Sequence, residues 1–189
     1  MQVADVLRVI YALLALGVLA AGRWQGAARV ARAALLVAAG ANILFVAFLC
    51  ANHVTFPLHL DLMEGTVLQH FRQIMAGQPI YPAPTPEYVP LAYNPLYYVL
   101  AVPFGWLLGA DLPTLRLVAI LGWALSALIL YAVVREKTRS TWWAWLAVGL
   151  FAAAYRAMDA YLDTAHSDSW LLGAALLGTY LLEKERSRA

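Results

Sequence analysis

Charged residues are scarce in this 189-residue chain: they make up only 13% of it, whereas hydrophobic residues make up 63%. Soluble domains usually contain about 25% charged and roughly 45 to 50% apolar residues. Together with a mean hydropathy of +0.68, this excludes an ordinary soluble domain, a disordered chain and a coiled coil. The net charge is only +2, so no basic stripe is present and a nucleic-acid partner is excluded. We interpret the chain as an all-α integral membrane protein.

Cysteine is nearly absent as well. The single cysteine, Cys50, lies inside an apolar run and permits neither an intrachain disulfide nor a cysteine-based zinc site. Nucleophile-elbow, glycine-rich phosphate-loop and HExxH patterns are also missing from the sequence. A catalytic or metal site would therefore have to be built from histidine and carboxylate side chains.

Apolar runs close to the roughly 20 residues that a spanning helix needs indicate about five transmembrane helices. These runs cover residues 6–22, 33–51, 117–134, 142–155 and 170–182. The last run is short and spans only if its helix begins near Asp163 or extends past Glu183. A secretory signal peptide is the competing interpretation of the first run, but the basic cluster directly after it favours a retained helix.

The apolar stretch 95–109 decides the topology. It begins with Pro95 and carries Pro103 in its interior, where proline removes a backbone hydrogen bond. If this stretch does not cross and the N-terminus is outside, nine Lys and Arg residues face the cytoplasm and four face outside, as the positive-inside rule requires. We therefore predict a juxtamembrane or re-entrant helix here. The tryptophans expected at the cytoplasmic interface are Trp142, Trp143 and Trp145.

Two extracytoplasmic loops result from this topology: a large one at residues 52–113 and a shorter one at 156–168. All four histidines and most carboxylates lie in or beside these loops, so we expect the functional face to be extracytoplasmic. Apolar residues in the first loop recur at spacings of three and four, which predicts a short amphipathic helix able to lie on the membrane surface. They are Val67, Leu68, Phe71, Ile74 and Met75.

Ionisable and aromatic side chains in these loops are the candidate site residues. Asp61 and Glu64 are three apart, so they share a face near the positive end of the helix dipole if the helix starts by Asp61. The alternative is that both acids only cap the helix. Four tyrosines follow, either as membrane-interface anchors or as surfaces on which a sugar ring stacks. They are Tyr88, Tyr93, Tyr97 and Tyr98.

The order of these segments resembles the N-terminal part of the GT-C superfamily, membrane glycosyltransferases that use a polyprenyl-phosphate sugar. The superfamily includes protein mannosyltransferases and lipid A aminoarabinose transferases. The similarity covers residues 33–183. It is carried by Asp61-Leu62-Met63-Glu64, by Gly77 with Tyr81, by Tyr93-Asn94-Pro95-Leu96-Tyr97-Tyr98, and by Gly109-Ala110-Asp111 with Leu115-Arg116-Leu117.

Two departures from the family pattern matter. Many relatives have adjacent acids and a proline at the position of Asn94, whereas here two residues separate Asp61 from Glu64. Relatives also have about twice as many spanning helices in a far longer chain. This single membrane domain, residues 1–189, therefore resembles the N-terminal portion of a longer protein or a truncated reading frame, and such a fragment could lack activity by itself.

The resemblance implies a hexosyl- or pentosyltransferase of the bacterial inner membrane that takes its sugar from a polyprenyl-phosphate donor among the membrane lipids. The acceptor hydroxyl is not specified. Because a polyprenyl phosphate leaves without protonation, one base suffices for inverting displacement, whereas a glycosidase needs two carboxylates. The resemblance assigns the base to Asp61 with support from Glu64. The substrate contacts it implies are Tyr93, Tyr97, Arg116, Asp163, His166 and Asp168; a divalent metal stays open.

A non-enzymatic membrane protein, such as a lipid-carrier transporter subunit or an assembly scaffold, explains the hydrophobicity and the short chain equally well. A transporter would place acids at the bilayer midplane, whereas here they cluster at the outer ends of the spans. The enzyme interpretation further predicts one shared site. At least one of Asp163, His166 and Asp168 should lie within about 10 Å of the Asp61 carboxylate.

Overall fold

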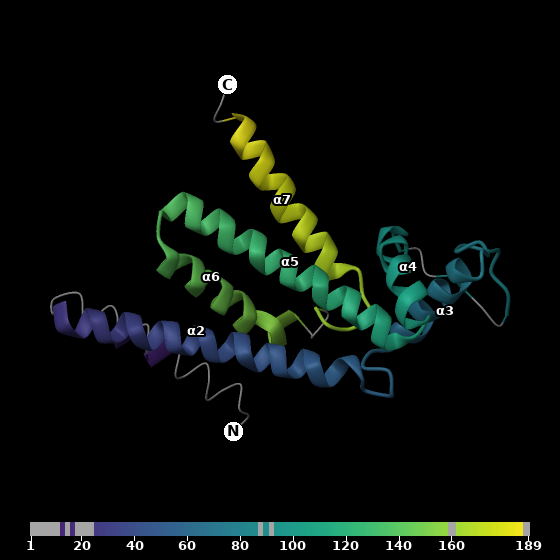
Figure 1. Ribbon diagram of the computed structural model, residues 1–189, viewed down its shortest axis with the longest axis horizontal. Coiled ribbons are helices and arrows are strands. Elements are labelled where there is room, and N and C mark those ends of the chain that lie inside the picture. The colour runs from purple at the N-terminus through teal and green to yellow at the C-terminus, as the bar shows by residue number, and fades with distance from the viewer. Residues whose placement is uncertain are drawn as a thin grey trace.

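The computed structural model describes residues 12–13, 16–17, 25–86, 89–90, 93–158 and 162–186. Over these residues the chain is helical and contains no strand, which confirms the all-α prediction. Three helices lie side by side with α6 in the middle, and a fourth, α7, packs on the far side of α5 and diverges from it (Figure 1). In that spatial order they are α2 (Gln25–Val54), α6 (Thr141–Ala153), α5 (Leu112–Thr138) and α7 (Asp168–Arg186).

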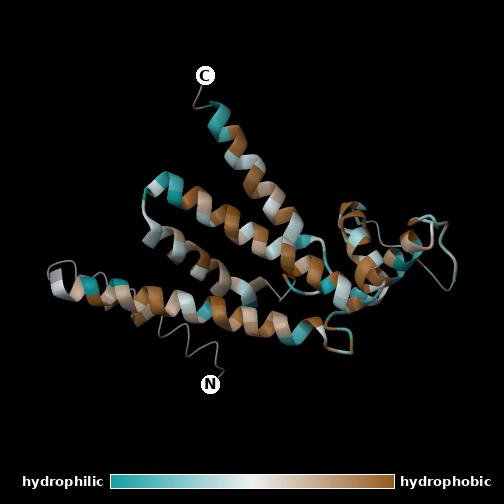
Figure 2. Cartoon of the chain, in the orientation of Figure 1, coloured by the Kyte–Doolittle hydropathy of each residue, from teal (hydrophilic) through white to brown (hydrophobic). Residues whose placement is uncertain are grey.

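Two of these helices are long and apolar enough to cross a membrane, by length and composition: Gly26–Val54 of α2 and all of α5. Many apolar side chains on them face outward; Val37 and Leu44 of α2 are 73% and 72% exposed. Figure 2 shows the hydrophobic residues along the helices and the hydrophilic ones gathered toward the helix ends and connections. A large exposed apolar surface promotes aggregation in water but suits contact with lipid.

The remaining apolar helices are shorter. Helix α4 (Leu96–Leu108), in the stretch predicted to be juxtamembrane or re-entrant, is 13 residues long, or roughly 20 Å, which is shorter than a hydrocarbon core of about 30 Å. It continues through Pro103 and packs against α3 and α5. Helix α6 continues into the 3-10 helix η2 (Ala154–Met158), and α7 extends past Glu183. The run 6–22 lies almost entirely outside the described residues.

Small residues bring α5 and α7 into close contact. The Ser126 hydroxyl of α5 donates to the Gly122 and Ser169 carbonyls, both at 2.9 Å. The Ser169 hydroxyl of α7 donates back to the Ala119 carbonyl at 2.8 Å. A Cβ atom on Gly173 would lie 2.8 Å from the Ser126 hydroxyl oxygen. Such small-residue contacts let helix backbones approach closely. Here they hold the first turns of α7 against α5 and so position the loop that precedes α7.

The predicted amphipathic helix is present as α3 (Glu64–Met75), but its apolar face does not lie free on a membrane surface. Val67 and Phe71 are fully buried among residues of α4 and α5. The approach to α4 is so close that a Cβ atom on Gly105 would lie 2.6 Å from the Phe71 ring. The apolar stripe is therefore covered by α4, which forms within the stretch 95–109.

Candidate functional site

The two predicted outer loops meet through Asp61 and His166. Asp61 lies between α2 and α3, and His166 lies between η2 and α7. The Asp61 Oδ2 and His166 Nε2 atoms are 2.9 Å apart; the side chains are 23% and 6% exposed, respectively. The prediction that a second-loop residue lies within about 10 Å of Asp61 is thus confirmed. We call these two residues the Asp61–His166 pair.

Asp61 lies in the turn that precedes α3. The helix begins at Glu64, so the condition under which Asp61 and Glu64 would share a helix face, a start by Asp61, is not met. Asp61 Oδ2 also accepts the Met63 backbone N–H at 2.9 Å. Burial alone would raise the pKa of Asp61, but the bonds from His166 and Met63 outweigh it and hold this pKa below its ordinary value. The Asp61 carboxylate is therefore ionised at neutral pH.

Glu64 and Arg116 form a fully buried ion pair. Arg116 donates from Nε and Nη2 to the two Glu64 carboxylate oxygens at 2.9 and 2.6 Å. Its remaining bonds go to the backbone carbonyls of His53, Phe56 and Leu58, at 2.8, 2.6 and 2.7 Å. These five bonds match the five N–H groups of a guanidinium. Arg116 therefore holds the end of α2 and the chain after it, and we assign it a positioning role in place of the expected substrate contact.

Glu64 also joins the two outer loops. Its carboxylate accepts the Leu60 N–H at 2.7 Å from the first loop and the Ala165 N–H at 3.0 Å from the second. Burial would raise the pKa of Glu64, but the bonds from Arg116 and from these two N–H groups lower it overall. Glu64 thus places Asp61 and His166 relative to each other without facing the site itself.

Asp163 is buried away from Asp61. Its Oδ2 lies 2.7 Å from His53 Nδ1, and its Oδ1 accepts the Tyr155 hydroxyl at 2.7 Å. Asp163 is fully buried, whereas the His53 side chain is 27% exposed. The sequence interpretation did not assign roles to His53 or Tyr155. Both lie at the predicted outer ends of predicted spans. A polar side chain at such a position is a candidate site residue, and this pattern could have identified them from the sequence.

The two tyrosines proposed as substrate contacts have different surroundings. Tyr93 is 36% exposed, and its ring centroid lies 6.3 Å from that of His166. Tyr97 is 2% exposed, and its hydroxyl donates to the Leu115 carbonyl at 2.7 Å, so it offers no free face to a sugar. Tyr88 lies outside the described residues. The cavity beside Tyr93, about 630 Å³, is lined by Tyr81, Pro90, Tyr93, Asn94 and Pro95.

Asp61 itself borders an open cavity of about 340 Å³, lined by His59, Leu60, Asp61 and Leu62. Beyond His166, Asp168 Oδ2 lies 3.6 Å from His166 Nδ1, so the imidazole stands between two carboxylates.

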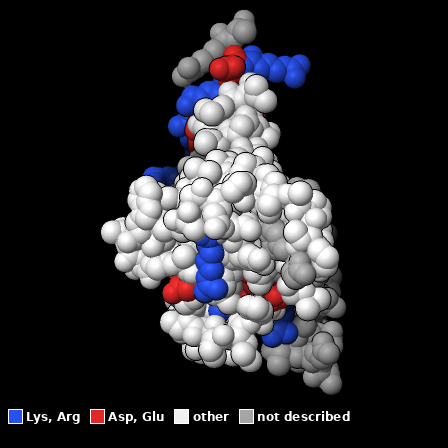
Figure 3. Space-filling model, turned by 90° about the vertical axis from the view of Figure 1, so that its right-hand side faces the viewer, with Lys and Arg blue, Asp and Glu red and all other residues white. Residues whose placement is uncertain are grey.

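Within the described ranges, no group of three His, Cys, Asp or Glu side chains is placed to hold a metal ion. Figure 3 shows a few charged side chains, some of opposite charge next to each other, on a mostly uncharged surface over the end of the molecule that carries α3 and α4.

Comparison of the chain with protein-family models, with curated proteins and with solved structures finds no match. The candidate function therefore depends on the geometry of the site and on the sequence motifs.

Proposed function

We propose that this protein is a membrane glycosyltransferase that moves a hexose or pentose from a polyprenyl-phosphate carrier to an acceptor hydroxyl on the extracytoplasmic side of a bacterial inner membrane. The observation that supports it best is the Asp61–His166 pair. A carboxylate and an imidazole 105 positions apart in the chain meet there beside an open cavity. Ionisable side chains that converge on a cavity beside membrane spans are candidates for a functional site.

In the proposed reaction, Asp61 accepts the proton of the acceptor hydroxyl as its oxygen attacks the anomeric carbon. The new carbon–oxygen bond forms on the face opposite the donor phosphate. The old carbon–oxygen bond breaks, and its electron pair leaves with the phosphate. His166 orients the Asp61 carboxylate through the 2.9 Å contact. Tyr93, exposed beside His166, offers an aromatic face on which the sugar stacks.

The supporting residues have separate tasks in this proposal. Glu64 and Arg116 join both loops behind the pair. Asp163 holds His53 at the end of α2, and Asp168 lies on the far side of the His166 ring. A divalent metal stays an open cofactor.

The proposed topology has five spans with the N-terminus outside and the Asp61–His166 pair at the outer surface. By rise per residue, α6 with η2 reaches about 30 Å, close to the thickness of the hydrocarbon core, and α7 reaches about 28 Å when its charged last four residues are included. The first span is the predicted run 6–22. Helix α4 is juxtamembrane, so both of its ends face the outside.

The topology predicts that both ends of α4 are accessible from outside the cell. Single cysteines at Gln78 and Asp111, in a Cys50→Ala background, should both react with a membrane-impermeant maleimide in intact cells. Gln78 is exposed and Asp111 half-buried; loss of the Asp111 cap of α5 costs about 1 kcal/mol, which the fold should tolerate. Labelling at Gln78→Cys without labelling at Asp111→Cys would mean that α4 crosses the membrane.

The reaction predicts inversion at the anomeric carbon. The experiment incubates the purified protein, or its full-length form where the chain is longer, with a panel of hexosyl and pentosyl polyprenyl phosphates and cell-envelope extracts as acceptors. The anomeric configuration of the product, read from proton NMR coupling constants, should be opposite to that of the donor. A product of retained configuration would refute direct displacement by an acceptor hydroxyl. Absence of transfer from every donor would refute the transferase proposal.

A non-enzymatic membrane scaffold is the second candidate function. One observation favours it: most polar groups at the outer end are bonded to one another, as in the Glu64–Arg116 pair and the contacts of Asp163 with His53 and Tyr155. Such a network also fastens loops in a protein without catalytic activity. A lipid-carrier transporter subunit is less favoured, because these acids lie at helix ends and not in mid-helix.

A further inference from the structure

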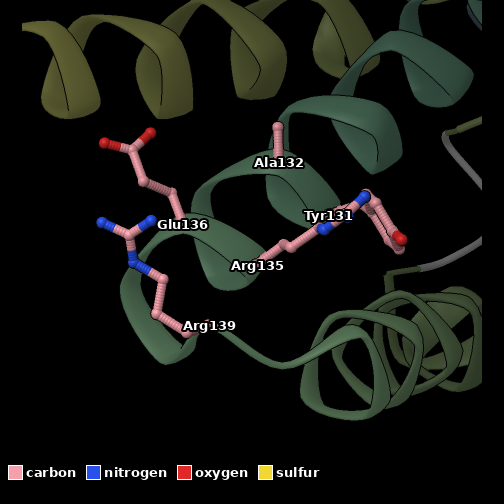
Figure 4. Close-up of a pocket in the computed structure, with 5 residues that line it drawn as sticks. All are labelled: Tyr131, Ala132, Arg135, Glu136 and Arg139. Carbon is pink, nitrogen blue, oxygen red and sulfur yellow. The ribbon is translucent and has the colours of Figure 1, made fainter.

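A second polar cavity lies at the opposite end of α5 from the Asp61–His166 pair. It has a volume of about 530 Å³ and is lined by Tyr131, Ala132, Arg135, Glu136 and Arg139 (Figure 4). Arg135 and Arg139 are exposed, and within the described part of the chain neither guanidinium forms a hydrogen bond or a salt bridge. Exposed guanidinium groups beside a cavity are a ready partner for a phosphate group.

Glu136, the acidic residue that lines this cavity, is hydrogen-bonded to α7. The Tyr180 hydroxyl of α7 donates to the Glu136 carboxylate, and Figure 4 shows Glu136 pointing toward α7, away from Arg135 and Tyr131. Lys184, Lys137 and Arg139 also act electrostatically on Glu136. Three cations therefore surround this one carboxylate, and Arg135, on the other side of the cavity from Glu136 (Figure 4), leaves the cavity with an excess of positive charge.

An apolar groove adjoins the cavity through Trp145 of α6. The Tyr131 ring packs edge-on against the Trp145 ring, with centroids 5.2 Å apart. Trp145 also borders a groove of about 370 Å³ between α2 and α6, whose other lining residues are Leu36, Ala39, Gly40, Ile43 and Leu44. A Cβ atom on Gly40 would meet nothing within 4 Å, so the groove is open there. A basic cavity and an apolar groove therefore share one aromatic wall.

We propose that this cavity and groove together bind one anionic phospholipid, with its phosphate at Arg135 and Arg139 and an acyl chain along α2 and α6. The charges fit the headgroup, because basic residues at a membrane surface attract anionic lipids. The depth fits as well: the two arginines stand at the end of α5, whereas residues 36–44 lie in the middle of α2. The site requires only that α2 and α5 span the membrane and is independent of glycosyl transfer.

The test measures thermal unfolding of the protein in a mild non-ionic detergent with three additives: phosphatidylglycerol, phosphatidylcholine of the same acyl chains, and inorganic phosphate. Phosphatidylglycerol should raise the midpoint temperature at a roughly 30-fold lower concentration than phosphatidylcholine, because two arginines attract a headgroup of net negative charge, whereas the choline of phosphatidylcholine neutralises its phosphate. Inorganic phosphate should not shift the midpoint. If inorganic phosphate alone reproduces the shift, the cavity is a free-anion site and the lipid proposal is wrong.

Two pairs of variants locate the lipid. Arg135→Gln with Arg139→Gln should abolish the preference for phosphatidylglycerol. A control of equal charge, Arg29→Gln with Arg186→Gln, removes two other exposed cations and should keep the preference. Gly40→Leu should fill the groove and weaken the binding of both lipids at least fivefold. Gly26→Leu is the control: Gly26 also lies in open space on α2, and its substitution should leave the binding of both lipids unchanged.

Besides a shift by inorganic phosphate alone, three outcomes would overturn the lipid site: no preference for phosphatidylglycerol in the wild type, an unchanged preference without Arg135 and Arg139, or a groove variant that binds lipid normally. Should the Arg135 and Arg139 variant fail to fold, Gly40→Leu still decides whether the groove holds lipid. Asp61→Asn should keep the full lipid response. The lipid site and the transferase proposal can therefore fail separately.

Discussion

Replacing Asp61 with asparagine is expected to lower glycosyl transfer by roughly 10²- to 10⁴-fold, the usual contribution of a general base. Asparagine keeps the size of the side chain and an oxygen that can accept the Met63 N–H, but it cannot take the proton of the acceptor hydroxyl. The measurement is kcat/KM with the sugar donor that the protein uses, in its full-length form where the chain is longer. Because the pKa of Asp61 is lowered, the wild-type base stays ionised down to acidic pH.

Asp111→Asn is the matched control for this change. Asp111 also precedes a helix at the same end of the molecule, and its carboxylate accepts the Thr114 N–H at 3.1 Å. Asparagine caps helices about as well as aspartate, so transfer should stay within a factor of about two. If Asp61→Asn also left transfer within a factor of about two of wild type, Asp61 would only support the turn before α3, and the result would favour the non-enzymatic scaffold as the function.

The meeting of the outer loops could be predicted from the sequence because it depends on topology alone. Both loops leave helices on the same side, and packed helices lie about 8 to 10 Å apart. Which side chains would pair could not be predicted. His166 reaches Asp61, whereas Asp163, three residues earlier, points to His53. These residues lie in an irregular turn before α7, where neither helical nor strand periodicity sets side-chain directions.

Helix positions could be predicted better than helix ends. The apolar runs 33–51 and 117–134 lie inside α2 and α5, which continue several residues further at both ends. Hydropathy marks only the stretch that suits lipid, whereas backbone hydrogen bonding continues into polar residues such as Arg29 and Lys137. The same limit applies to Tyr97, because a tyrosine-rich run does not reveal which ring packs in the core and which, like Tyr93, stays exposed.

The buried pair of Glu64 and Arg116 had no local signal, since 52 positions separate its partners. Arg116 stood in the sequence as one of four outer basic residues, and only the fold shows that its contacts are internal. Burying two charges is costly unless every hydrogen-bonding group is satisfied. Here Glu64 accepts bonds from Arg116, Leu60 and Ala165. Removing one partner therefore leaves the other buried charge without compensation.

Arg116→Met is expected to destabilise the protein more than any exposed arginine substitution does, by about 3 to 5 kcal/mol, because the buried Glu64 carboxylate loses its cation and three backbone carbonyls lose their donor. In a chain of this size that corresponds to a fall in midpoint temperature of roughly 10 °C, measured by thermal unfolding in detergent. Arg72→Met is the matched control. Arg72 is exposed and donates only from Nε to the Ala110 carbonyl at 3.0 Å, so its loss should cost under about 1 kcal/mol.

The pH dependence of unfolding separates the charge of Glu64 from its packing. Because the pKa of Glu64 is lowered in the fold, the stabilisation from ionisation is fully present above the ordinary glutamate value of 4.5 and is lost as pH falls through the lower, folded value. Glu64→Gln should therefore lower the midpoint temperature at neutral pH and remove part of the wild-type decline below pH 4.5. Equal midpoints of wild type and Glu64→Gln at neutral pH, with parallel acid declines, would show that the ion pair contributes no net stability and that neutral hydrogen bonds suffice to hold the two loops together.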